Sequence, residues 1–500
     1  MSPLVMLALF LIALGYVVEK YTENEEMPTV TFCRLFPDFI NRLLFFVKGP
    51  SLINYGYNKY NDRPFRILKV DADMIVLPAK YLPEIRYLPL SQISLLDAQF
   101  NSVCGDYTNI LNNSNLPAHT VAKRMTTSLH RIIPNVIDEL QHAFKIEVPE
   151  CTNRWVPVNL YSTVLRLINR ATSRIIVGDS LCRNEDWLNT VTSYTHNLGL
   201  TIILLRPLPR FLRPFAARLL PSVQYLNKTL KLVKEEVFVP IILARREAEA
   251  NDLGYQKPDD FMQWMMDTAD NEYDKKPENI AQGLMIIMAL AVVHTSTMLI
   301  TQAIYDLLIR QEYIAPLRYE IMDTLRGGWL NATQSCFKAQ YRLDSFLRES
   351  QRFNPTSEVN VQRITKEPLV FSDGLTIPAN THICFASGPL SRDPANLPYP
   401  NLDPSTFDGF RWCRDLYARN NKLVSMSPSN LHFGYGRQVC PGRHFAANTS
   451  KAILSRLLVE YDMKFEEGKE GRRPLNIRNG EQIMPNFYAT VLIRRTGDEI

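Results

Sequence analysis

A single cysteine, Cys440, stands in a glycine-rich loop directly ahead of a helix-forming stretch. From Phe433 to Gly442 the residues are Phe-Gly-Tyr-Gly-Arg-Gln-Val-Cys-Pro-Gly. Glycine adopts backbone angles that other residues avoid and permits close approach to a flat group, so we expect Gly434, Gly436 and Gly442 to be required. A helix N-terminus adds free N–H groups and a positive dipole end, and both favour a thiolate over a thiol. The loop therefore predicts one thiolate presented to a metal ion, and the competing interpretation is a buried structural cysteine.

A second pattern precedes this loop in the chain. Glu349 and Arg352 are spaced i and i+3, so they share one face of a helix and can pair. The segment Phe353-Asn354-Pro355 then stops that helix. Alone the pair is a weak signal, because a Glu-x-x-Arg arises by chance in a chain of this length. Its position ahead of an arginine segment, Phe407–Trp412, and of the cysteine loop makes the pair informative.

Together these segments resemble the cytochrome P450 family. Four residues fall at the spacing of the family's haem-binding loop: Phe433, Gly436, Cys440 and Gly442. The resemblance extends over nearly the whole chain and is closest to fungal enzymes of secondary metabolism that oxidise terpenoids. It implies a mostly α-helical fold with small β-sheets. It also implies a haem b whose iron is bound by Cys440.

The resemblance assigns further residues to the haem. The family usually has a basic residue two positions before the cysteine, facing a haem propionate, whereas this chain has the uncharged Gln438. The other expected propionate contacts are Arg363 and the pair His119 and Lys123, spaced i and i+4 on an early helix. His119 matches the family only loosely, and an exposed helix histidine is the alternative.

The resemblance also implies a buried cluster of charged residues. In the family, the arginine of the Phe407–Trp412 segment closes a cluster with the Glu-x-x-Arg pair. In this sequence the three residues are Glu349, Arg352 and Arg411. Removing one member of such a buried cluster is costly, because it leaves an uncompensated charge. We expect these three residues to be structural.

The long segment from Asn279 to Arg310 has no charge in its centre and predicts a buried helix rather than a membrane span. The resemblance places this helix across the distal face of the haem, where the family has an acid followed by a threonine. Thr295 matches the threonine, whose hydroxyl is expected to hold the proton that splits iron-bound dioxygen. His294 replaces the acid. It is a candidate proton relay near neutral pH, and the alternative is a histidine bonded to a neighbouring carbonyl.

The first eighteen residues carry no charge, and as a helix they would span ~27 Å, close to the hydrocarbon thickness of a bilayer. A cleaved signal peptide is the alternative, but no positively charged segment precedes the apolar run. We expect an uncleaved transmembrane anchor over residues 1–20 and one haem domain over residues 21–500. The apolar, proline-broken segment Ile203–Phe215 either dips into the membrane or packs as a loop.

Four glycosylation sequons occur, at Asn112, Asn227, Asn331 and Asn448. Asn448 lies on the helix that follows Cys440 and is expected to pack under the haem, where a glycan does not fit. This favours a domain that faces the cytosol. The resemblance implies a single-pass protein of the endoplasmic reticulum membrane, and whether any sequon is used stays open.

No dinucleotide-binding glycine fingerprint or flavin domain is present, so the chain is not expected to reduce itself. The resemblance implies electrons from NADPH–cytochrome P450 reductase, with cytochrome b5 as a second candidate donor. The net charge of +5 is mild, and no basic block with interleaved aromatics indicates nucleic acid. Four basic residues near the cysteine are expected to form a patch for an acidic donor, or else a solvated face: Arg437, Arg443, Lys451 and Arg456.

The predicted function is monooxygenation of a lipophilic, terpenoid-type natural product, with dioxygen and NADPH-derived electrons. Two other functions are open. One is a haem-thiolate enzyme that rearranges or dehydrates its substrate without external electrons. This function stays open because His294 replaces the acid that the family usually has. The other, from a different class, is a membrane-tethered binding protein with a structural cysteine.

Overall fold

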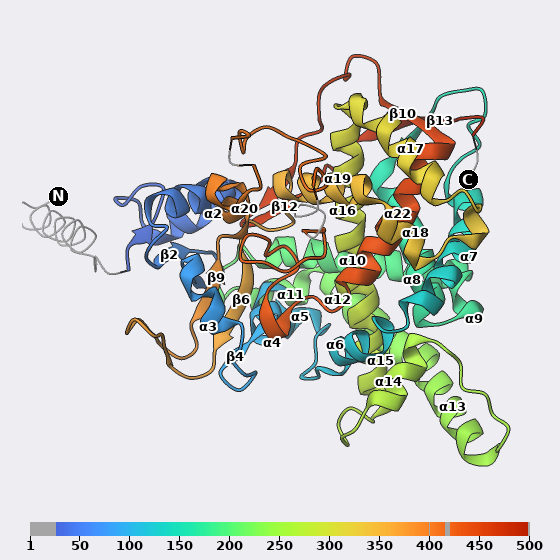
Figure 1. Ribbon diagram of the computed structural model, residues 1–500. Helices are drawn as coiled ribbons and strands as arrows, with labels where there is room; N and C mark the ends of the chain where they lie inside the picture. The colour runs from blue at the N-terminus through green and yellow to red at the C-terminus, as the bar shows by residue number, and fades with distance from the viewer. Residues whose placement is uncertain (1–26, 400, 416–420, 499–500) are drawn as a thin grey trace, which may run out of the picture.

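Helices make up most of the protein, and its main β-sheet lies on the N-terminal side of the helical part (Figure 1). The computed structural model describes residues 27–399, 401–415 and 421–498. The expected anchor, residues 1–20, lies outside the described residues. The predicted class, mostly α with small β-sheets, is confirmed.

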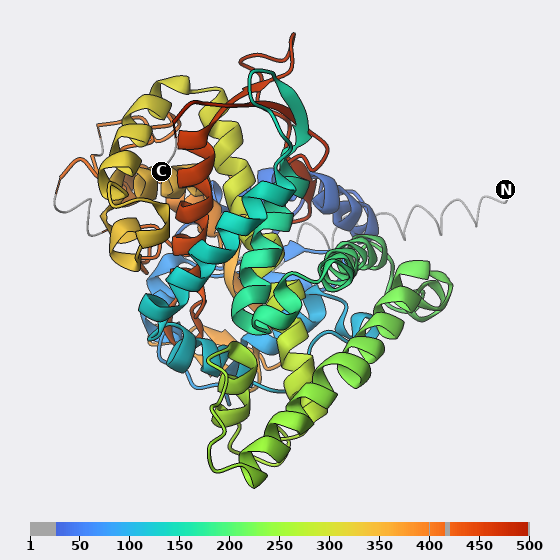
Figure 2. The same ribbon diagram turned by 90° about the vertical axis from the view of Figure 1, so that its right-hand side faces the viewer.

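The helices have unequal lengths, and the long ones form the body of the molecule. Their bounds are α2 (Asp38–Lys59), α3 (Leu82–Ile85), α4 (Leu95–Ser102), α5 (Gly105–Thr108), α6 (Leu116–Thr120), α7 (Leu129–Glu147), α8 (Leu160–Ile176), α9 (Asp179–Cys182), α10 (Glu185–Leu205), α11 (Arg213–Leu219), α12 (Pro221–Leu232), α13 (Val239–Asn251), α14 (Phe261–Thr268), α15 (Pro277–Met285), α16 (Val293–Leu308), α17 (Ile314–Thr324), α18 (Gln334–Ala339), α19 (Tyr341–Phe353), α20 (Ser387–Arg392) and α22 (Arg443–Glu460). Three π-helical segments continue or join these helices: η2 (Val121–Met125), η3 (Val233–Phe238) and η4 (Ile286–Val292). Figure 2 shows α12 and α13 forming one long rod with η3 between them.

The largest sheet has six strands in the order β1-β2-β3-β9-β6-β4. Strands β1 and β2 are parallel, as are β3 and β9, and the other neighbours are antiparallel. A smaller sheet has the order β10-β13-β5. The strand bounds are β1 (Thr29–Val30), β2 (Phe65–Leu68), β3 (Asp73–Val76), β4 (Ile93–Ser94), β5 (Val156–Asn159), β6 (Asn360–Thr365), β7 (Leu369–Val370), β8 (Thr376–Ile377), β9 (His382–Phe385), β10 (Tyr461–Phe465), β11 (Ile477–Asn479), β12 (Gln482–Met484) and β13 (Thr490–Arg495).

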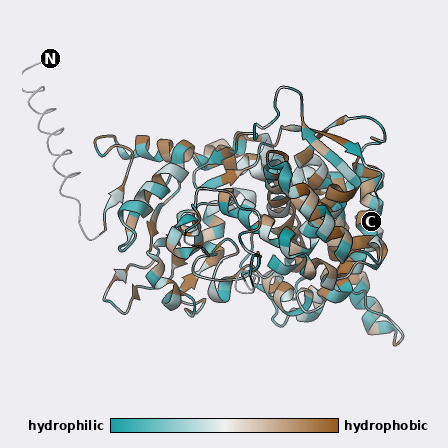
Figure 3. Ribbon diagram, turned by 45° about the horizontal axis from the view of Figure 1, so that its top comes forward, coloured by the Kyte–Doolittle hydropathy of each residue, from teal (hydrophilic) through white to brown (hydrophobic). Residues whose placement is uncertain are grey.

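The central apolar segment is helical from Pro277 to Leu308, as predicted, but its middle turns, η4, are π-helical. Among the described residues it is the helix long and apolar enough to cross a membrane, and 61% of its most apolar window is buried inside the fold. It packs on α8, α19 and α22, so it is a core helix. Hydrophobic residues gather on the central helices of this part (Figure 3).

The helix that follows the cysteine loop, α22, is buried along almost its whole length. The expected basic patch is therefore wrong for two of its four residues, Lys451 and Arg456. Lys451 forms an ion pair with Asp344 at 2.6 Å, and Arg456 pairs with Glu460 at 2.7 Å. Both basic side chains are buried and cannot meet a partner protein. Asn448 is also buried on this helix, in keeping with the argument against a glycan there.

Candidate active site

The backbone angles of the cysteine loop require glycine at two positions. Gly434 has φ +84° and Gly436 has φ +75°, values that other residues rarely adopt. A Cβ at Gly436 would also lie 2.6 Å from the carbonyl oxygen of Arg86. Gly442 has an ordinary φ of −82°. The expectation that Gly442 needs unusual backbone angles is therefore wrong, and its place is the N-cap of α22.

The loop folds back on itself, and this fixes Cys440. The Cys440 amide donates to the carbonyl of Phe433 at 2.7 Å, which accounts for the spacing between the two residues. The backbone N–H groups of Gly442 and Arg443 point at the cysteine sulfur. Burial nevertheless raises the pKa of the Cys440 thiol, against these donors and the Arg443 charge. The helix start alone thus does not make a thiolate, and a metal cation would have to complete it.

The side chain of Gln438 ties this loop to the sheet. Its Oε1 accepts from the Leu95 N–H at 2.9 Å, and its Nε2 donates to the Ile93 carbonyl at 3.3 Å. Both ends of the amide are therefore bound to the β4–α4 segment. The residue that replaces the family's cation is a cross-link between the loop and the backbone of this segment.

Arg363 lies beside the loop and has no carboxylate partner among the described residues. Its NH1 donates to the Gln362 carbonyl at 2.7 Å, its NH2 lies 3.5 Å from the Gln438 carbonyl, and its Nε has no partner. Burial lowers the pKa of Arg363 to about 10. An unpaired buried guanidinium is costly, so its chemistry fits an anion such as a haem propionate. A register shift in β6 between Asn360 and Arg363 accompanies this placement.

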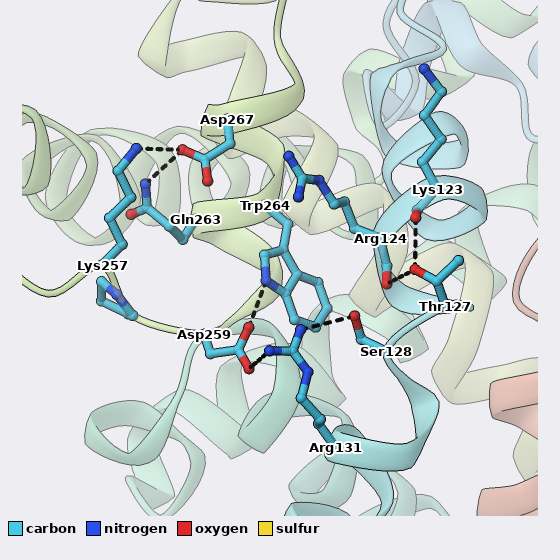
Figure 4. A pocket seen from close by; sticks show the side chains of 11 residues that line it. Lys123, Arg124, Thr127, Ser128, Arg131, Lys257, Asp259, Gln263, Trp264 and Asp267 are labelled. Atoms are coloured by element: carbon cyan, nitrogen blue, oxygen red, sulfur yellow. Dashed lines mark hydrogen bonds and ion pairs between the residues drawn. The ribbon is translucent and has the colours of Figure 1, made fainter.

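The segment that carries His119 and Lys123 packs on the cysteine loop through other residues. The Thr126 hydroxyl donates to the Pro441 carbonyl at 3.2 Å, and Val121 lies next to Gly442. The side chains of His119 and Lys123 are both exposed. In Figure 4 the Lys123 ammonium points away from the other side chains around it. The structure thus brings the backbone of this segment to the loop and leaves both side chains open to solvent.

One strip of the central helix is accessible. Ala291 and Thr295, four residues apart and therefore on one face, are exposed, whereas Val293, Ser296 and Thr297 are buried. The Thr295 hydroxyl donates to the Ala291 carbonyl at 2.7 Å. Because α16 contacts α22, this strip belongs to the helix that packs against the one starting at the cysteine loop. An accessible strip on a core helix fits a bound cofactor.

Next to it, His294 is half-buried with both ring nitrogens engaged. Nδ1 lies 2.7 Å from the Tyr161 hydroxyl, and Nε2 lies 3.1 Å from the Thr195 carbonyl. Burial lowers the pKa of His294 below its usual value. This arrangement matches the carbonyl-bonded alternative and leaves no free nitrogen for a proton relay. Sequence reasoning missed Tyr161 and Thr195, since no local pattern connects them to His294.

Glu349, Arg352 and Arg411 meet in one buried cluster. Arg352 binds both Glu349 carboxylate oxygens, at 2.9 and 2.7 Å, and Arg411 Nε lies 3.3 Å from Oε1. The Trp412 indole and the Asp408 amide donate to the same carboxylate. All lone pairs of the carboxylate are thereby used. Sequence reasoning missed the Trp412 and Asp408 donors.

A mostly helical fold with Cys440 in the loop before a core helix, beside a buried arginine that has no acidic partner among the described residues, fits a haem-thiolate protein. The cytochrome P450 family model matches residues 118–484. The chain therefore belongs to the cytochrome P450 family, whose members are haem-iron oxidoreductases.

Relatives cover almost the full chain. The cytochrome P450 monooxygenase penP of Penicillium crustosum is 44% identical over 98% of this chain and 94% of its own length. The monooxygenases AtmP of Aspergillus flavus and paxP of Penicillium paxilli are 43% and 42% identical, each over 99% of this chain and 95% of its own length. The solved structure of retinoic acid bound cyanobacterial CYP120A1 has a TM-score of 0.67, with 91% of this chain and 96% of that one covered. At 15% identity it supports the fold alone.

Proposed function

We propose that this chain is a membrane-anchored monooxygenase that uses dioxygen and NADPH-derived electrons to oxidise a lipophilic, terpenoid-type natural product in fungal secondary metabolism. The observation that carries the proposal is the cysteine loop, with Cys440 at the start of α22 and two backbone N–H groups aimed at its sulfur. The relatives support the reaction class, since all three are fungal cytochrome P450 monooxygenases.

The cofactor would be haem b, which supplies the activation of dioxygen when bound. Cys440 would be the axial ligand, in a loop shaped by Phe433, Gly436 and Gly442. Arg363 is the cation best placed for a propionate, because it is buried without an acidic partner among the described residues.

The other residues assigned to the haem have lesser roles in this proposal. Gln438 would hold the loop through its bonds to the β4–α4 segment. His119 and Lys123, whose side chains are exposed, would be further donors to a propionate.

Thr295 would hold the proton on the dioxygen side. Its Oγ1 donates to the Ala291 carbonyl, which leaves the oxygen lone pairs available as acceptors on the accessible strip. Rotation about the Cβ–Oγ1 bond would turn the same proton from the carbonyl toward the accessible strip. His294, with both nitrogens engaged, would not carry that proton.

Electrons would come from NADPH–cytochrome P450 reductase, with cytochrome b5 as a second donor. Around a surface hollow of about 740 Å³ lie four basic side chains and two carboxylates: Lys123, Arg124, Arg131, Lys257, Asp259 and Asp267 (Figure 4). Arg437 of the cysteine loop is also exposed. This excess of positive charge would steer an acidic donor toward the side of the molecule that carries the loop.

The proposed location is the endoplasmic reticulum membrane, with residues 1–20 as the single span and the domain 21–500 facing the cytosol. The segment Ile203–Phe215 supports contact with the bilayer, because Phe211 and Phe215 are 72% and 64% exposed. On α2, Phe39 is 64% exposed. Exposed aromatic side chains on two segments suit a surface that enters lipid.

Arginines link both apolar segments to one turn. Arg210 donates to the Asp71 carbonyl at 3.0 Å, and Arg42 pairs with Asp73 at 2.5 Å. The β2–β3 turn, which carries Asp71, and the first residue of β3, Asp73, therefore hold the two segments against the same part of the sheet.

The test is to incubate membranes that contain the full chain and its reductase with a panel of terpenoid intermediates, and to follow product by mass shift. We expect an NADPH-dependent gain of oxygen. In the chemically reduced protein under carbon monoxide, we expect the red-shifted absorption band of a thiolate-bound haem. Turnover without NADPH would indicate a rearrangement instead. A missing band, or unchanged haem content in Cys440→Ala, would indicate a binding protein.

A further inference from the structure

Three helices meet at His294. The residue lies in the first turn of α16, directly after the π-helical segment η4. Its ring contacts Tyr161 of α8 at 2.7 Å and the carbonyl of Thr195 of α10 at 3.1 Å. The segment η4 itself packs on both α8 and α10. His294 thus joins the turn that carries Thr295 to the two helices beside it.

The direction of both hydrogen bonds follows from the partners. The Thr195 carbonyl can only accept, so Nε2 must carry the proton. A neutral imidazole then has a lone pair on Nδ1, which accepts from the Tyr161 hydroxyl. Burial lowers the pKa of His294 and raises that of Tyr161, so both groups keep these forms at neutral pH. The pair is fully satisfied and uncharged.

The connection extends beyond the three helices. The Tyr161 ring packs on Phe487 with a centroid separation of 4.5 Å, and Phe487 lies in the loop between β12 and β13. The carbonyl of Phe487 accepts from the Asn159 side chain at 2.8 Å. A displacement of α10 or of this loop would therefore shift the turn that precedes Thr295.

We propose that His294 is a positioning residue, which fixes the rotation of the first turn of α16 against α8 and α10 and so holds Thr295 on the accessible strip. The inference rests on the proposed function. The segment η4 makes this connection important, because its π-helical i to i−5 bonds must give way to the i to i−4 ladder of α16 at this point. Two side-chain bonds from His294 add a restraint at the point where α16 begins.

The consequence is that His294 influences whether electrons from NADPH lead to oxidised product or to hydrogen peroxide. In the coupled reaction NADPH, H⁺, O2 and a substrate C–H bond give NADP⁺, a C–OH product and H2O. In the uncoupled reaction NADPH, H⁺ and O2 give NADP⁺ and H2O2, with the substrate unchanged. Loss of the connection would let Thr295 move and shift electrons toward hydrogen peroxide.

The test compares His294→Leu with His294→Gln in the full-length holoenzyme. Leucine keeps the volume and removes both bonds, whereas the glutamine amide can donate to Thr195 and accept from Tyr161. With reductase, NADPH and the panel terpenoid that the wild type converts, we expect roughly a tenfold higher ratio of peroxide to product for leucine and near wild-type values for glutamine. Tyr161→Phe, which removes one bond, should fall between them.

A second readout needs no turnover. Amide hydrogen exchange over residues 293–297 should be about tenfold faster in His294→Leu than in wild type, and restored in His294→Gln. If leucine leaves both exchange and the peroxide ratio unchanged at full haem content, the proposal is wrong. Faster exchange with an unchanged ratio would show a purely structural role and also overturn it. A wild-type enzyme without a thiolate band would instead refute the proposed function.

If His294→Leu does not fold, the Tyr161→Phe variant is used to test the proposal. It keeps the imidazole and the packing on Phe487 and removes the bond to Nδ1. A wild-type ratio and wild-type exchange in Tyr161→Phe would contradict the proposal.

Discussion

Replacing Glu349 with alanine should be among the most damaging single changes outside the cysteine loop. The carboxylate accepts from Arg352 and Arg411, and also from the Trp412 indole and the Asp408 amide. Its loss leaves two arginines almost completely buried without an acid. Breaking a buried ion pair in this way costs about 3–5 kcal/mol.

That cost is large against the whole stability of a domain, about 5–15 kcal/mol. Part of it is offset, because Arg352 also donates to the Pro404 carbonyl and Arg411 to the Thr406 carbonyl. Carbonyls satisfy N–H donors but do not neutralise a charge, so we expect the net loss to stay near the lower end, about 3 kcal/mol.

The assay is thermal unfolding together with haem content per mole of protein. We expect the apparent Tm of Glu349→Ala to fall by roughly 3 °C, with a matching loss of the reduced, CO-bound thiolate band. The control is Asp323→Ala, because Asp323 pairs with Arg326 on the surface. An exposed pair contributes about 0–1 kcal/mol, so that variant should resemble wild type. If both variants unfold alike, the argument from buried charge is wrong.

Three further predictions follow from the site, the sheet and the surface. Arg363→Ala should lower haem retention several-fold after gel filtration, whereas Arg363→Lys should retain part of it; full retention in the alanine variant would remove Arg363 from the propionate site. His382 is buried beside the cluster of Lys69, Asp71, Arg206 and Glu481, and burial lowers its pKa to about 4. Since this folded-state pKa lies below the unfolded value of about 6.5, His382 stabilises the fold above pH 6.5 and loses that effect as pH falls toward 4. His382→Gln should therefore flatten the Tm profile between pH 7 and pH 5, and an unchanged profile would contradict this. Phe211→Ser with Phe215→Ser should weaken binding of the full chain to lipid vesicles at unchanged Tm, whereas equal binding would show that the anchor alone suffices.

Local patterns in the sequence predicted the parts of the site that lie close together in the chain. The cysteine loop is one such case, because the Phe433–Cys440 spacing is set by a hydrogen bond within the loop. The Glu349–Arg352 pair is another, because i, i+3 residues on a helix meet by geometry. Arg411 could be added only through the family resemblance, since no local rule links it to a helix about sixty residues away.

Other features depended on contacts that no local pattern reveals. Lys451 and Arg456 were expected on the surface, because charged residues on a helix usually face solvent. Each instead pairs inside the fold, Lys451 with Asp344 and Arg456 with Glu460, so the helix is buried despite its charges. The bonds of His294 to Tyr161 and Thr195 could not be predicted from local patterns either, because they join residues about a hundred positions apart.

The cysteine loop is held by its neighbours as well as by its own backbone. Gln438 bonds to Ile93 and Leu95, and Gly436 packs on the Arg86 backbone at a distance that excludes a side chain. The loop is therefore placed by protein contacts on two sides. Restoring the family's cation with Gln438→Arg would leave the Leu95 N–H without its partner, since arginine has no acceptor. We expect this variant to retain less haem than wild type, despite its added charge. Higher retention would show that charge, rather than the cross-link, is what position 438 contributes.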